Sequence, residues 1–77
     1  MPRFFFHLYD DIVARDEDGL ELPDAEAARQ EALRAARALA AEEVSRGRLV
    51  LHHRIEVEAE DGVIARISFG DALTIEP

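Results

Sequence analysis

The feature that most constrains this chain is one long segment, residues 24–47, whose helical pattern places small side chains on one face. Asp24 can cap its start, because an aspartate there accepts hydrogen bonds from free backbone N–H groups. Gly47 can adopt the left-handed conformation that ends many helices. A face of small side chains brings a helix close to its neighbour, so other segments must supply the large core residues. The residues expected on this face, or flanking it, are Ala25, Ala28, Ala32, Leu33, Ala36, Leu39, Ala40 and Val44.

The opening residues MPRFFFHLY predict a strand that supplies part of this bulk. Side chains alternate between the two faces of a strand. We expect Phe4, Phe6 and Leu8 to pack under the alanine face of the helix. The side chains expected on the opposite face are Arg3, Phe5, His7 and Tyr9.

Residues 54–69, RIEVEAEDGVIARISF, predict a hairpin with alternating apolar and polar positions. A two-residue loop at Asp61-Gly62 would mix the two faces. We therefore expect a three-residue loop, Glu60 to Gly62, with Gly62 in the left-handed bulge position. The pairs that follow are Ala59 with Val63, Val57 with Ala65, Ile55 with Ile67 and Glu56 with Arg66.

The remaining segments complete one α+β domain covering residues 1–77. Residues 12–15 are expected to form a short strand that folds back on the first, and Leu20 and Leu22 to lie under the start of the helix. Residues 70–77 are compatible with either a strand or a turn. The predicted element order is β-β-α-β-β, a small and mostly antiparallel sheet with one long helix on one face.

A single helix, about 10 Å across, cannot cover both faces of such a sheet. The face left over is too aromatic for plain solvent surface, so we interpret it as a candidate binding face. Its candidate residues are Arg3, Phe5, His7, Tyr9, His52, Arg54, Ile64 and Arg66.

Composition limits the partners that this chain can take. It has 77 residues, no cysteine, 9 basic and 17 acidic residues, and a net charge of −8. A thin core without disulfides favours support from a partner chain. The negative charge argues against nucleic acid and against anionic membrane surfaces. No apolar run is long enough to cross a bilayer, and the start does not resemble a signal peptide, so we expect a cytoplasmic protein.

The residues offer little for catalysis, and we expect a protein that is not an enzyme and that uses no cofactor. His7, His52 and Glu56 could form a two-histidine, one-carboxylate metal set if their strands are neighbours. The alternative is a half-buried His7 stacked beside Phe5 and Tyr9. Residues 16–19, DEDG, fail the calcium-loop pattern because alanines occupy its first and last ligand positions.

Three stretches together resemble a family of short bacterial proteins with no assigned activity, domain of unknown function 6894: MPRFFFHL, RDEDGLELPDAEAARQEAL and DGVIARISFGDAL. Its members commonly begin M-P-x-[YF]-[YF]-F-H. They then carry an acidic D-x-x-G, an L-P-D helix start with spaced alanines, and a closing hairpin. In this chain Phe4 stands where tyrosine is frequent, and Asp10-Asp11 replaces a turn that often contains glycine. The resemblance spans nearly the whole chain but carries over no site residue.

Residues 19–39 also resemble the strand-to-helix segment of HicB-type antitoxins, whose compact α+β domain blocks a small toxin. The leading functional expectation is a small non-enzymatic interaction module. It would form a homodimer or bind a protein partner through the uncovered sheet face. The alternative is a HicB-like antitoxin, or a regulator that binds a small ligand, using the same face.

Overall fold

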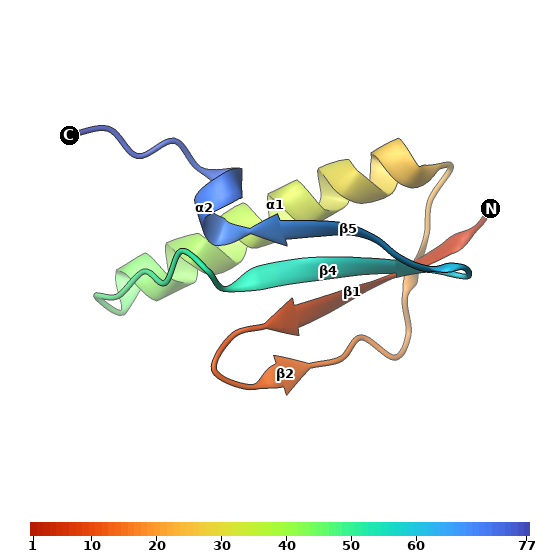
Figure 1. Ribbon diagram of the computed structural model, residues 1–77, viewed down its shortest axis with the longest axis horizontal. Coiled ribbons are helices and arrows are strands. Elements are labelled where there is room, and N and C mark those ends of the chain that lie inside the picture. The colour runs from red at the N-terminus through yellow and green to blue at the C-terminus, as the bar shows by residue number, and fades with distance from the viewer.

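An antiparallel sheet with one long helix across it makes up the computed structural model, which describes residues 1–77. The central strands are β1 (Arg3–Tyr9) and β4 (Arg54–Ala59), and the strand order is β2-β1-β4-β5. The flanking strands are β2 (Val13–Ala14) and β5 (Gly62–Ser68), and β3 (Leu20–Glu21) pairs with the start of β1. Helix α1 (Ala25–Ser45) lies along one side of the sheet (Figure 1). The predicted α+β class is confirmed, with β3 as an additional strand.

Helix α1 begins and ends where its sequence signals predict. The side chain of Asp24 accepts a hydrogen bond of 2.9 Å from the backbone N–H of Ala27. At the other end, Gly47 has a φ of +87° and its N–H donates to the carbonyl of Val44. The side chains on the buried face are those of Ala28, Ala32, Ala36 and Ala40.

The sheet and the chain end supply the bulk that the alanine face lacks. Phe4, Ile55, Val57 and Phe69 are all buried against the helix, and Phe6 and Leu8 pack beside them. Large apolar side chains that are fully buried, such as Val57 and Phe69, contribute about 1.5–3 kcal/mol each. The predicted inward set of β1 is therefore confirmed.

The β4–β5 hairpin confirms the predicted pairing of Ile55 with Ile67, Glu56 with Arg66 and Val57 with Ala65. The predicted three-residue loop is wrong, because Ala59 pairs with Gly62 across a two-residue turn. A register shift between Val57 and Glu58 leaves Ile64 as an extra residue in β5. This bulge restores the alternation of faces that a two-residue turn alone would break.

The chain end turns back onto the helix side of the sheet. Helix α2 (Phe69–Ala72) starts at Ser68, whose hydroxyl accepts from the N–H of Asp71, and Arg37 of α1 donates to the carbonyl of Ala72 at 2.8 Å. Both helices therefore lie on one side, called here the inner side (Figure 1). Neither helix has the length and apolar character that crossing a membrane requires.

Candidate functional site

The outer face is the side of the sheet that no helix covers, and it carries most of the predicted interface residues. The register places Tyr9 opposite Arg54, His7 opposite Glu56, and Phe5 opposite Glu58, while Arg66 pairs with Glu56 from the other side. Partners in an antiparallel pair share a face, so these side chains form one surface. The outer face is defined by Arg3, Phe5, His7, Tyr9, Glu21, Arg54, Glu56, Glu58, Val63, Arg66 and Ser68, with Ile64 as the extra residue of the bulge beside it.

One end of the outer face is an aromatic and arginine cluster. The guanidinium of Arg54 lies over the ring of Tyr9, with 4.4 Å between its carbon and the ring centroid. Its Nε donates to Oε2 of Glu56 at 2.8 Å, and Nε of Arg66 lies 3.5 Å from the same oxygen. The buried Glu56 thus holds two arginines side by side, and the Arg66 side chain remains 65% exposed.

His7 lies at the centre of the outer face and is buried, with only 4% of its surface exposed. Its Nδ1 accepts a hydrogen bond from the backbone N–H of Asp16 at 3.0 Å, so the ring proton lies on Nε2. Nε2 then donates to Oε1 of Glu58 at 2.8 Å, and Phe5 stacks beside the ring. Both ring nitrogens are therefore used within the chain.

Asp16 fixes the edge of β1 between β2 and β3. One carboxylate oxygen accepts from the N–H of Phe6 at 3.1 Å, and the other accepts from the N–H groups of Asp18 and Gly19. Burial alone would raise the pKa of Asp16, but these three hydrogen bonds outweigh it, and the pKa is lowered. Asp16 thus replaces the strand partner that Phe6 lacks at this edge.

Gly19 closes the same turn against the outer face. Its φ is +71°, and a Cβ at this position would come within 2.9 Å of the backbone oxygen of Phe4 and of the Phe5 ring. Only glycine fits such a conformation at such close approach. His7, Asp16 and Gly19, three residues from the motifs that carry the family resemblance, therefore meet in one hydrogen-bonded unit.

The other predicted interface residues divide into two groups. Arg3 is exposed at the end of β1, where it donates to the carbonyl of Asp18 and pairs with Glu21. Ile64 is 43% exposed at the bulge in β5. His52 does not belong to the outer face, because β4 begins at Arg54 and His52 is exposed in the preceding turn.

The metal set of His7, His52 and Glu56 does not assemble. His52 lies outside the strand, both nitrogens of His7 are engaged, and Glu56 is held by two arginines. No group of three histidine, cysteine or carboxylate side chains is arranged to hold a metal ion.

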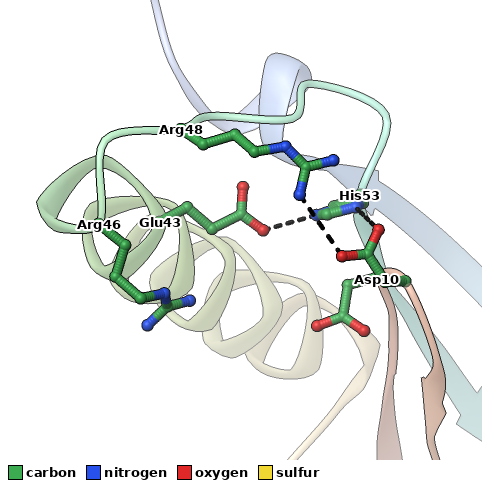
Figure 2. Close-up of a pocket in the computed structure, with 6 residues that line it drawn as sticks. Asp10, Glu43, Arg46, Arg48 and His53 are labelled. Atoms are coloured by element: carbon green, nitrogen blue, oxygen red, sulfur yellow. Dashed lines mark hydrogen bonds and ion pairs between the residues drawn. The ribbon is translucent and has the colours of Figure 1, made fainter.

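A polar pocket at the far end of α1 was not anticipated from the sequence. Its volume is about 290 Å³, and Figure 2 shows Asp10, Glu43, Arg46 and Arg48 around His53. His53 is buried, and its Nδ1 lies 2.5 Å from Oε2 of Glu43. Asp11, which also lines the pocket, lies 3.5 Å from Nε2 of His53 and pairs with Arg48.

The contacts of the pocket are those of a structural clamp. Burial would raise the pKa of Glu43, but hydrogen bonds from the N–H of Val50 and from His53, together with the charge of Arg48, lower it. His53 also packs edge to face on Phe69, so it joins α1, β4 and α2. No hydrophobic residue lines the pocket, which distinguishes it from most small-molecule sites.

Fold and site together define a small α+β domain whose outer sheet face is covered by no helix and carries aromatic and charged side chains beside the turn at residues 16–19. The chain belongs to the family described as Domain of unknown function (DUF6894), whose model matches residues 3–70. No curated protein and no solved structure gives a significant match.

Proposed function

We propose that this protein is a small interaction module that associates with another protein chain through the outer face of its sheet. The observation that carries the proposal is the asymmetry of the sheet. Both helices pack on the inner side (Figure 1). The outer face keeps two partly exposed aromatic rings, Phe5 and Tyr9, beside the partly exposed Arg54 and the exposed Arg66. Tyrosine, phenylalanine and arginine are enriched in protein interfaces and dominate their energetics.

The proposed role is non-enzymatic and cytoplasmic. The two buried histidines are the natural candidates for acid–base chemistry, but each is hydrogen-bonded to a carboxylate and packed within the fold. His7 supports the outer face from below, and His53 holds the end of α1 to the sheet. Titratable clusters that satisfy each other in this way also occur as structural networks.

Tyr9→Glu tests the proposal, with Ala38→Glu as its matched control. Glutamate at position 9 can still pair with Arg54, so the fold should persist while the aromatic contact is lost. Ala38 is exposed on α1 and receives the same added charge. Both variants should keep the far-ultraviolet circular dichroism spectrum of the wild type.

The readout is molar mass by light scattering behind size exclusion, together with a comparison of the proteins that co-purify with each variant. We expect Tyr9→Glu to lose the association, or the co-purifying protein, that the wild type and Ala38→Glu retain. An antitoxin-like or ligand-binding regulator using the same face would be monomeric alone and would lose a heterologous partner. If Tyr9→Glu matches the wild type in both readouts, the proposal is wrong.

A further inference from the structure

The outer face is electrically polarised along its strands. One end carries the row of Tyr9 and Arg54, with Arg66 beside it. The other end carries the row of Phe5 and Glu58 and leads into the exposed turn at Glu60 and Asp61. At this end Glu58 pairs with Arg15, and Arg3 pairs with Glu21. These two ion pairs are neutral and the turn adds two negative charges, so the two ends present an aromatic ring each and differ in the sign of their net charge.

Both charged ends retain unused hydrogen-bonding groups. Arg54 and Arg66 approach Glu56 through Nε, and their Nη groups make no hydrogen bond within the chain. Glu58 uses only Oε1, toward His7 and Arg15, and its side chain is 38% exposed. A guanidinium with free Nη groups matches a carboxylate with a free oxygen.

We infer that a second copy of this chain occupies the outer face, packed face to face with its strands antiparallel to those of the first. The inference rests on the proposed function and names its partner. A twofold axis across the strands, through the row of His7 and Glu56, sets Tyr9 over Phe5 of the second copy. The same axis sets Arg54 over Glu58 of the second copy, and symmetry repeats both contacts.

The charge pattern selects this arrangement over the other face-to-face arrangement. A twofold axis parallel to the strands would set Arg54 over Arg54 and Glu58 over Glu58, which is repulsive. Each chain has a net charge of −8, so two copies repel over most of their surface. The strands of the sheet carry three arginines and three glutamates and have no net charge, so copies can approach there.

The size of the face sets the expected strength. Three strands about 4.8 Å apart and about seven residues long bury on the order of 500 Å² per copy. A total near 1,000 Å² lies at the low end for specific interfaces, so the dimer should be weak and depend on concentration.

A charge exchange tests the pairing directly. Arg54→Glu and Glu58→Arg each set like charges opposite one another when either variant meets itself. A mixture of the two variants restores both ion pairs. We therefore expect each variant alone to be monomeric, and their equimolar mixture to dimerise, by sedimentation equilibrium. A mixture that stays monomeric while the wild type dimerises overturns the antiparallel arrangement.

Cross-linking provides a second test if either charge variant fails to fold. The chain has no cysteine, so Phe5→Cys and Tyr9→Cys introduce the only thiols. A bis-maleimide of about 10 Å matches the spacing of two stacked sheets. We expect a covalent product from the mixed variants and little from either alone, since identical positions lie about 13 Å further apart along the strands. Ala38→Cys is the control and should give no product.

The remaining outcomes separate the inference from the proposed function. Products from Phe5→Cys alone would indicate parallel strands and overturn the inference. A wild type that stays at 8.6 kDa at every concentration also overturns it, and leaves the outer face to a heterologous partner. A dimer that Tyr9→Glu and both charge variants leave intact contradicts the proposed function itself.

Discussion

Replacement of Asp16 by asparagine should remove a large part of the stability of this domain. The carboxylate accepts three backbone hydrogen bonds, from Phe6, Asp18 and Gly19. Asparagine can keep the bonds at one oxygen, but its amide group then faces the N–H of Phe6, and two donors meet. A hydrogen bond to a charged acceptor contributes about 1.5–3 kcal/mol, and an unsatisfied donor costs about 1–3 kcal/mol. We therefore expect a loss of about 2 kcal/mol for Asp16→Asn and about 3 kcal/mol for Asp16→Ala.

Urea denaturation followed by circular dichroism measures this loss. With a slope of about 1 kcal/mol per molar urea for a domain of this size, Asp16→Asn should lower the midpoint by about 2 M. Glu17→Gln is the matched control, because Glu17 is exposed in the same turn and makes no hydrogen bond. It should unfold within about 0.5 kcal/mol of the wild type.

Acidification should reduce the difference between the wild type and Asp16→Asn. The pKa of Asp16 is lowered below its ordinary value of 3.8, so the folded state favours the charged form. Its contribution to stability is complete above that ordinary value and is lost as the pH falls through the folded pKa. The gap between the midpoints should therefore close below about pH 4. Equal midpoints of Asp16→Asn and Glu17→Gln at pH 7 would refute the reasoning.

Three further substitutions test the turn, the helix face and the clamp. Gly19→Ala should lower the free energy of unfolding by more than about 2 kcal/mol, because the added Cβ meets Phe4 and Phe5. Gly47→Ala, at a positive φ with no neighbour in reach, should lower it by about 1 kcal/mol, and equal losses would contradict the close contact at Gly19. Ala32→Leu should overpack the core and lower the free energy of unfolding, measured in urea, by about 1–3 kcal/mol, whereas Ala38→Leu on the exposed face should leave it almost unchanged. Equal effects of the two substitutions would contradict the packing of Ala32 against the sheet. Glu43→Gln should lower the free energy of unfolding by about 1–2 kcal/mol at pH 7. Because the pKa of Glu43 is lowered in the folded state, this loss should shrink as the pH falls below 4.5, the ordinary pKa of a glutamate. A loss that does not change with pH would contradict the role of the Glu43 charge.

Local chemistry in the sequence was enough to place the helix and most pairs of the β4–β5 hairpin, whereas the pairing of β1 with β4 was not predicted. Asp24 and Gly47 bound α1 because capping depends on a few neighbouring residues. The pairing of Val57 with Ala65 followed from keeping apolar side chains on one face. The bulge at Ile64 was missed, because both loop lengths lead to the same pairs from Val57 with Ala65 onward and differ only next to the turn.

The site was less predictable, because its contacts join segments far apart in the chain. His52 was assigned to the outer face, but β4 starts two residues later, after the turn beneath α2. His53 and Glu43 meet only once α1 and β4 are packed, so no local spacing marks them. Asp16 had a local signal in its D-x-x-G turn, yet its bond to Phe6 depends on the path of the edge strands.

The most direct test of the central claim is a dilution series of the ¹⁵N-labelled wild-type protein followed by two-dimensional NMR. The amide signals that shift with concentration map the surface on which copies meet. The account predicts shifts confined to β1, β4 and β5, largest near Phe5, Tyr9, Arg54 and Glu58, with α1 unchanged. A dimer with a Kd of about 1 mM should still produce visible shifts at millimolar concentration. Shifts centred on α1, or no shifts in that range, would contradict self-association through the outer face.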